Sequence, residues 1–232
     1  MTIRWDKRFA EKYHSVELTE KKYILGPSIR RILRASKGKK LIDLGCGSGH
    51  YCRIFAKMNK KVTGIDKNLE QLNIAIEKED KQKLGIKYIK SDITNIKIKS
   101  DTFDIALLNF VLIEQPSTKI VKKIFKECYR LLRRNGTLVI GGMHPHNINI
   151  KNKNRHFTLK NKNASYFDNA AIGTSIALLT NGKKLVFKGD HHYTLEFLVN
   201  SLIVTGFNIQ LINELTWKEK FPIDIVIVAK KR

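Results

Sequence analysis

The chain has 232 residues, 42% of them hydrophobic, which suits one domain with a large core. It has no apolar run near the ~20 residues of a membrane span, no apolar segment typical of a signal peptide at its start, and three cysteines without a metal-binding spacing. We therefore expect a single cytoplasmic domain over 1–232, with no membrane span and no metal, and a net charge of +23 that would attract nucleic acids.

The N-terminal segment 17–36 is predicted to form two helices that meet at Gly26-Pro27, and we expect 1–38 to be a helical lid over the sheet. Short apolar runs then alternate with amphipathic stretches as far as 141, which predicts parallel strands connected by helices. The expected strands are 40–44, 61–65, 86–90, 103–108 and 137–141. The expected helices are 50–58, one capped by Asn68, and one that is capped by Ser117 and stopped by Asn135-Gly136.

The alternation breaks between 143 and 190. The polar stretch 151–155 is predicted as a loop, and Asn181-Gly182 predicts a hairpin between 176–179 and 184–187. A helix capped by Thr194 and strands at 207–212 and 223–228 complete the chain. The last two strands have a short connection, which requires antiparallel pairing. The whole pattern predicts an α/β, Rossmann-like three-layer sandwich.

The first strand ends in a glycine-rich turn, residues 45–49, with Asp43 just before it. Ligands of open parallel sheets bind beyond the carboxyl ends of the strands. The Gly-x-Gly-x-Gly spacing differs from the Gly-x-Gly-x-x-Gly of dinucleotide-binding turns. Asp43 would repel a pyrophosphate but suits a ligand with an ammonium and a sulfonium. Asp66, at the end of the second strand, is placed to accept bonds from both hydroxyls of a ribose.

Residues 41–49 resemble the first motif of class I S-adenosylmethionine-dependent methyltransferases, and the resemblance extends from 39 to 141. It implies a seven-stranded, mostly parallel sheet with an antiparallel last strand. It also implies S-adenosyl-L-methionine as the cofactor, S-adenosyl-L-homocysteine as the product, an adenine contact at Asp92, and a fourth strand whose end, Asn109, faces the methyl group. The cofactor-binding residues that we expect are Asp43, Gly45, Gly47, Gly49, Asp66, Lys67, Asp92, Ile93 and Asn109.

The resemblance is to the small-molecule branch of this family, so we expect a hydroxyl or amine acceptor. It divides the chain into a cofactor-binding core (39–142), an insertion that shapes the acceptor pocket (143–190) and a C-terminal helix and strand pair (191–232). Trp5 and Tyr13 could close over the ligands or anchor the N-terminal arm, and His50 is expected near the cofactor. The protein is expected to be a monomer or homodimer.

A base is needed only where the acceptor is a poor nucleophile such as a hydroxyl. His144 and His192 are the candidate catalytic bases, because an imidazole with a pKa near ~6.5 accepts a proton at neutral pH. Glu114 is a third candidate and could instead face an amine. Each histidine could equally cap a helix or fill a polar loop.

Three other functions stay open. An RNA (tRNA or rRNA) methyltransferase is favoured by the charge, although the lysines are spread along the chain, no RNA-binding module accompanies them, and no Asn-Pro-Pro-Tyr pattern begins at Asn109. A protein that binds S-adenosylmethionine without catalysis and a nicotinamide-dependent reductase are the others. Salt-dependent tRNA binding would support the first alternative, and tight NADH binding would support the last.

Overall fold

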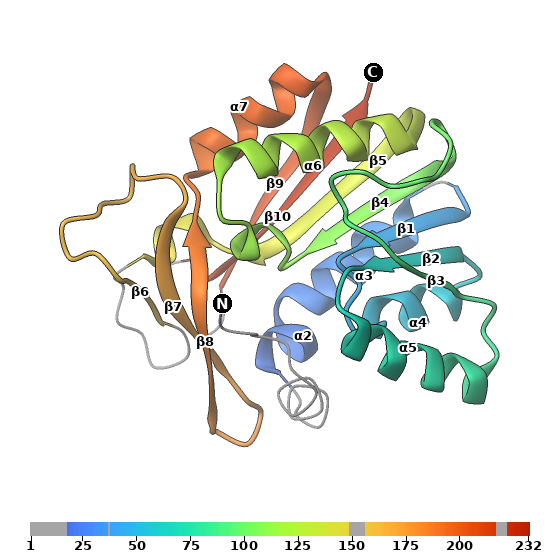
Figure 1. Ribbon diagram of the computed structural model, residues 1–232, viewed down its shortest axis with the longest axis horizontal. Helices are drawn as coiled ribbons and strands as arrows, with labels where there is room; N and C mark the ends of the chain where they lie inside the picture. The colour runs from blue at the N-terminus through green and yellow to red at the C-terminus, as the bar shows by residue number, and fades with distance from the viewer. Residues whose placement is uncertain (1–17, 37, 149–155, 217–221) are drawn as a thin grey trace.

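The computed structural model describes residues 18–36, 38–148, 156–216 and 222–232, and its centre is a seven-stranded sheet with the strand order β3-β2-β1-β4-β5-β10-β9 (Figure 1). The strands are β1 (Lys40–Leu44), β2 (Lys61–Asp66), β3 (Lys87–Lys90), β4 (Phe103–Asn109), β5 (Leu132–Met143), β9 (Phe207–Leu215) and β10 (Asp224–Lys231). Strands β1 to β5 pair in parallel, and β10 runs antiparallel to both β5 and β9. The predicted seven-stranded sheet with an antiparallel last strand is confirmed.

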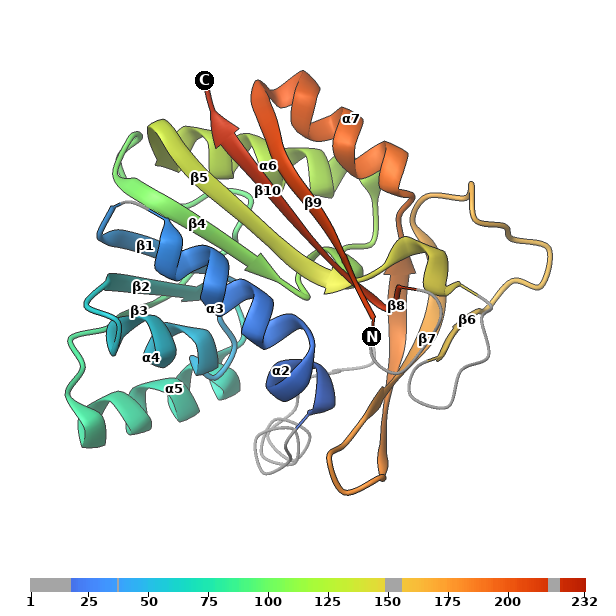
Figure 2. The ribbon, with the colours of Figure 1, turned by 180° about the vertical axis from the view of Figure 1, so that it is seen from behind.

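Helices cover both faces of this sheet (Figure 2). One face carries α3 (Leu25–Ala35), α4 (His50–Ala56) and α5 (Leu69–Gln82), and the other carries α6 (Thr118–Leu131) and α7 (Leu195–Thr205). Alternation along β1 sends Leu41 into the core of the first face and Ile42 into the core of the second. The result is the three-layer sandwich that the sequence predicts.

The helix caps follow the sequence signals. Asn68, Ser117 and Thr194 each accept a hydrogen bond from the backbone N–H three residues later, at the start of α5, α6 and α7. However, α6 ends at Leu131, and Asn135 lies inside β5 with a φ of 62° instead of stopping the helix.

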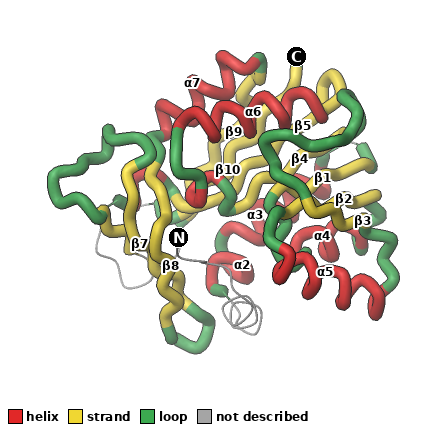
Figure 3. The backbone as a smooth tube through the Cα atoms, in the orientation of Figure 1, coloured by secondary structure: helices red, strands yellow, loops and turns green. Residues whose placement is uncertain are grey.

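A second sheet of three antiparallel strands, in the order β6-β7-β8, stands beyond the carboxyl ends of the parallel strands (Figures 1 and 3). Its strands are β6 (His156–Leu159), β7 (Ala171–Leu178) and β8 (Lys184–His192). The predicted hairpin is confirmed as β7 and β8, with Gly182 at a φ of 82° in the turn. The sequence analysis missed β6, which pairs with β7. Residues 151–155, which were predicted as a loop, lie outside the described residues.

The expected N-terminal lid needs correction. The break between α2 (Thr19–Tyr23) and α3 falls at Ile24, and Pro27 lies in the first turn of α3, where a helix tolerates the missing N–H. Leu25, Ile29 and Leu33 are fully buried, so α3 forms part of the core and not of a lid. Trp5 and Tyr13 lie outside the described residues.

Two short 3-10 helices follow strands of the main sheet. They are η1 (Leu112–Glu114), after β4, and η2 (Pro145–Asn147), after β5. Across the described parts of the chain, every helix is too short or too polar to cross a membrane.

Candidate active site

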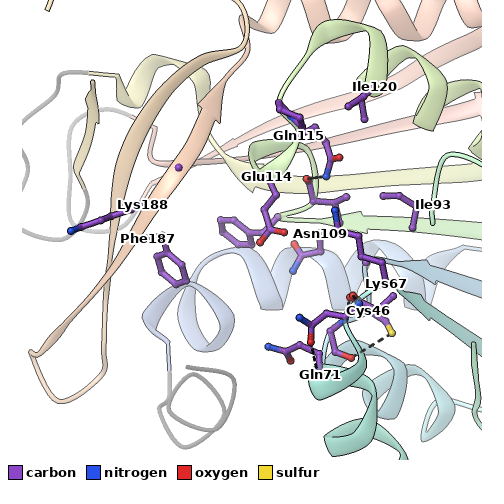
Figure 4. A pocket seen from close by; sticks show the side chains of 18 of the residues that line it. Cys46, Lys67, Gln71, Ile93, Asn109, Glu114, Gln115, Ile120, Phe187 and Lys188 are labelled. Carbon is purple, nitrogen blue, oxygen red and sulfur yellow. Dashed lines mark hydrogen bonds between the residues drawn. The ribbon is translucent and has the colours of Figure 1, made fainter. Parts of the chain in front are cut away.

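A cleft of about 1250 Å³ lies between the carboxyl ends of the parallel strands and the three-stranded sheet. We call its two sides the cofactor wall and the acceptor wall. The cofactor wall consists of the residues at and after the ends of β1, β2, β3 and β4, between Asp43 and Val111. The acceptor wall consists of Lys21, Glu114 and residues 158–160, 172–174 and 186–189. In Figure 4, Phe187 on β8 and Asn109 on β4 mark the two sides.

The glycine turn is fixed to the neighbouring strand. The backbone N–H groups of Gly45 and Cys46 donate to the carbonyl oxygen of Ile65, at 2.8 and 2.9 Å. Gly45 has a φ of 74°, and a Cβ there would lie 2.6 Å from a methyl carbon of Val111. A larger residue would therefore be strained in its backbone and would collide with the loop after β4.

Gly47 connects this turn to Asp66. Its N–H donates to Oδ2 of Asp66 at 2.8 Å, and the N–H of Asn68 donates to Oδ1 at 2.8 Å. Burial raises the pKa of Asp66, while these two bonds oppose that rise. The carboxylate is thus held at a fixed position beside the turn.

Asp43 and Asp92 line the same cleft in different surroundings. Asp92 is largely exposed, and the bonds from the N–H and hydroxyl of Thr94, both 2.7 Å, lower its pKa. Asp43 is only 3% exposed, and burial raises its pKa to about 7, against the lowering effect of a bond from Cys52. The three acids that the sequence picks out at strand ends therefore surround one common cleft.

Lys67, Ile93 and Asn109 also line the cleft, so every expected cofactor residue lies there except Gly49. Gly49 is the N-cap of α4 and has a φ of 73°. A Cβ there would lie 2.1 Å from the hydroxyl oxygen of Tyr88. Gly49 therefore serves the packing behind the turn and does not contact the cleft, which corrects its assignment.

The sequence analysis missed Gln71, which lines the cleft from the first turn of α5 and is 3% exposed. Its spacing from Asn68 is that of a capping box, in which the Gln side chain turns back to the N-cap N–H. Here that N–H donates to Asp66, and the side-chain oxygen of Gln71 faces Gly47 instead. The capping pattern is the sequence signal at Gln71, and it predicts a helix cap and not a residue of the cleft.

His144 and His192 do not line the cleft. They face a separate cavity of about 60 Å³ on the far side of Phe110. Nε2 of His144 is 2.8 Å from Oε1 of Glu214, and Nε2 of His192 is 2.8 Å from the carbonyl oxygen of Tyr166. Burial lowers the pKa of both imidazoles.

The structure therefore places the candidate bases His144 and His192 outside the cleft, each in a hydrogen bond with a neighbouring residue. The reason is the length of β5, which continues to Met143 and pairs there with Asp224 of β10. That extension carries His144 past the cleft and towards β9. Sequence alone places both histidines near strand ends. It does not show whether they line the cleft or the smaller cavity next to Phe110.

Glu114, the third candidate base, does line the cleft. Its carboxylate points into the open space beside Asn109 and opposite Phe187 (Figure 4). Glu114 ends η1, and the chain at this helix is fixed at two points. The side-chain amide of Gln115 donates to the carbonyl of Val111 at 2.8 Å, and the hydroxyl of Tyr193 donates to the carbonyl of Gln115 at 2.5 Å.

The groups that line the cofactor wall fit S-adenosylmethionine. The cofactor wall offers carboxylates, backbone at a glycine turn and the side chain of Asn109, and the described lining of the cleft contains no arginine that would match a pyrophosphate. Among the described residues, no group of three His, Cys, Asp or Glu side chains is arranged to hold a metal ion.

Comparisons with known proteins find similarity to methyltransferases. Residues 42–140 match the family described as Methyltransferase domain. A malonyl-[acyl-carrier protein] O-methyltransferase of Pectobacterium atrosepticum is 27% identical over 113 residues, 49% of this chain and 42% of that protein. A ubiquinone biosynthesis O-methyltransferase of Coxiella burnetii is 30% identical over 102 residues, 44% of this chain and 42% of that protein. The chain thus matches less than half the length of these curated relatives.

Among solved structures, an S-adenosylmethionine-dependent methyltransferase from Clostridium acetobutylicum superposes with a TM-score of 0.70. The superposition covers 97% of this chain and 98% of that one at 17% identity, which shows a shared fold. The family match covers the strands that build the cofactor wall, and the fold extends over the whole sheet. Residues 42–140 of this chain thus match a methyltransferase domain, and the sheet around them has the fold of an S-adenosylmethionine-dependent methyltransferase.

Proposed function

We propose that this protein transfers the methyl group of S-adenosylmethionine to a hydroxyl or amine of a small-molecule acceptor. The observation that carries the proposal is the meeting of Asp43, Asp66 and Asp92 in one cleft, with the three-stranded sheet as the opposite wall. Carboxylates at or just after the carboxyl ends of β1, β2 and β3 suit a positively charged nucleoside without phosphates.

Each residue of the cofactor wall has a role in this proposal. Asp66 accepts hydrogen bonds from the ribose hydroxyls, and Asp92 with Ile93 holds the adenine. Gly47 lets the ligand approach the backbone closely, because it has no side chain where the turn faces the cleft. When bound, S-adenosylmethionine supplies an activated methyl group on a sulfonium. The chain therefore has to orient the two reactants and exclude water.

Glu114 is the residue that we propose to act on the acceptor. Its carboxylate projects from the end of η1, which Gln115 and Tyr193 hold in place, next to Asn109 at the end of β4. There it would accept a proton from a hydroxyl or hold an amine in position for attack. The three-stranded sheet would cover the acceptor and keep water away from the reacting groups.

A small acceptor is supported by the position of the three-stranded sheet and by the names of the two curated relatives, both O-methyltransferases. Within the segment 143–190, we assign the described residues 158–160, 172–174 and 186–189 to the acceptor pocket on the same ground. A cytoplasmic location is part of the proposal, because Cys46, Cys52 and Cys128 are all free thiols. The net charge of +23 favours RNA as the second candidate acceptor.

The test is to incubate the protein and its Glu114→Gln variant with methyl-labelled S-adenosylmethionine and a cell extract separated into metabolites and RNA. We expect label in the metabolite fraction with the wild type and far less with the variant. Label confined to RNA would favour the second candidate. Label in neither fraction, with S-adenosylhomocysteine still bound, would support a binding protein without methyl transfer.

A further inference from the structure

The carboxylate of Asp43 accepts a hydrogen bond from a buried cysteine thiol. The thiol of Cys52, on α4, donates to Oδ2 of Asp43 at a sulfur–oxygen distance of 3.2 Å. Cys52 is 0% exposed and Asp43 is 3% exposed. The other oxygen, Oδ1, accepts no hydrogen bond from any residue in the described parts of the chain. One carboxylate oxygen is thus tied to the thiol, and the other is left for a ligand in the cleft.

The remaining neighbours of Asp43 do not favour its charge. The titratable groups that face it are Cys52 from α4, Cys46 from the glycine turn, Asp66 from β2 and Tyr88 from β3. None of these four carries a positive charge, and Asp66 repels a second carboxylate. Because a thiol is a weak donor, it compensates only part of the cost of burying the charge.

The position of Cys52 is built into the fold. Gly64, opposite Asp43 on β2, leaves room for the Cys46 thiol and the Tyr88 ring, because a Cβ there would lie 2.9 Å from the sulfur and 2.8 Å from a ring carbon. The side chains of Cys46 and Tyr88 fill the space behind the glycine turn. Among the described side chains around Asp43, Cys52 is the one that donates a hydrogen bond to its carboxylate.

We propose that Cys52 is a positioning residue for the cofactor: its thiol fixes the carboxylate of Asp43 on the wall of the cleft, where that carboxylate meets the ligand's ammonium group. The proposal rests on S-adenosylmethionine being the ligand of this cleft. Burial already raises the pKa of Asp43 to about 7. Loss of the thiol donor raises that pKa further, so cofactor affinity near neutral pH depends on Cys52.

The experiment is calorimetric titration of the full chain with S-adenosylhomocysteine between about pH 6 and pH 8.5, a range that brackets the titration of Asp43. Two variants test the proposal: Cys52→Ala removes the donor, and Cys52→Ser replaces it with a hydroxyl. Cys128→Ala is the matched control, because Cys128 is also 0% exposed but lies in the core between α6 and the other face of the sheet. Thermal unfolding checks that each variant is folded.

We expect affinity to fall as the pH drops in the wild type, with the midpoint of that fall near pH 7. In Cys52→Ala the midpoint should move up by about one pH unit, which lowers the ionised fraction of Asp43 at pH 7 by about fivefold. Cys52→Ser should keep the wild-type midpoint or lower it, and Cys128→Ala should leave it unchanged.

An unchanged midpoint in folded Cys52→Ala would overturn the proposal, and so would an equal shift in Cys128→Ala. If Cys52→Ser behaves like Cys52→Ala, the donor is not what matters and the proposal is also overturned. These results would leave the methyltransferase assignment standing, since S-adenosylhomocysteine would still bind. A wild type that fails to bind S-adenosylhomocysteine would overturn both.

Discussion

The two walls of the cleft are built in opposite ways. The cofactor wall comes from short segments at and just after the ends of the parallel strands, and backbone N–H groups fix two of its carboxylates, Asp66 and Asp92. The acceptor wall comes from distant parts of the chain, from Lys21 to Gly189, and depends on the packing of a second sheet. We therefore expect that mutations can separate binding of the cofactor from recognition of the acceptor.

The largest effect should come from Glu114, which belongs to the acceptor wall. Glu114→Gln removes the proton-accepting oxygen while keeping the shape, and general-base catalysis contributes about 10²–10⁴-fold in rate. We expect kcat to fall by about that factor with a hydroxyl acceptor, and the affinity for S-adenosylhomocysteine to stay unchanged. Steady-state kinetics and calorimetry measure the two quantities.

The control for this variant is Glu196→Gln, an exposed residue of the first turn of α7 outside the cleft. Equal rates in Glu114→Gln and Glu196→Gln would show that the acceptor wall holds no base at Glu114.

The next effect concerns the cofactor wall. Asp66→Ala removes the acceptor for the ribose hydroxyls and also for the N–H groups of Gly47 and Asn68. We expect cofactor binding to weaken by about 1–3 kcal/mol, because buried donors lose their partner. Calorimetry with S-adenosylhomocysteine measures this change. Asp80→Ala, at an exposed position of α5, is the control, and equal affinities in the two variants would show that the ribose is held elsewhere.

Much of the cofactor wall could be predicted from sequence because its signals are local. A strand, a glycine turn and an acid lie within a few residues of each other, so the positions of Asp43, Gly45 and Gly47 follow from spacing. Spacing does not show which glycines face the ligand, and Gly49 turned out to pack against Tyr88.

The acceptor wall was much less predictable. The Asn181-Gly182 turn identifies one hairpin, but β6 has only four residues and pairs with β7 across a loop, which no local pattern indicates. The amphipathic pattern of α3 shows that one side of the helix is buried. It does not show that this side packs against the main sheet. The two histidines were misplaced for a similar reason, because the length of β5 depends on its pairing with β10.

A smaller effect should appear at Asp43. Its pKa is raised to about 7 by burial, so the carboxylate loses its charge as the pH falls through that value. The ammonium group of S-adenosylhomocysteine binds the charged form better, so affinity should fall with pH by up to about tenfold per unit below that point. Asp43→Asn should bind more weakly at pH 8 and show no such slope. A slope that survives in Asp43→Asn would assign the titration to another group.

The smallest effect on catalysis should come from His144. His144→Ala leaves both walls intact, so turnover should be close to wild type. Stability should fall by about 1–3 kcal/mol, because the variant loses the contacts with Glu214 and His146. Thermal or urea unfolding measures that loss, and a large loss of turnover in a folded variant would return His144 to the catalytic residues.

The pH dependence of stability gives a second check on His144. Burial lowers its pKa in the folded state, so the unfolded chain takes up the proton first as the pH falls below about 6.5. The stability that His144 contributes is therefore present above that pH and is lost below it. His144→Ala should lose less stability than the wild type between about pH 6.5 and pH 5.

The most direct test of the proposed cofactor site is a crystal structure of the protein with S-adenosylhomocysteine. We expect the ribose hydroxyls at Asp66, the adenine beside Asp92 and Ile93, and the sulfur facing the open space between Asn109 and Glu114. A ligand bound elsewhere, or bound in the cleft with Asp66 and Asp92 out of reach of the nucleoside, would contradict it.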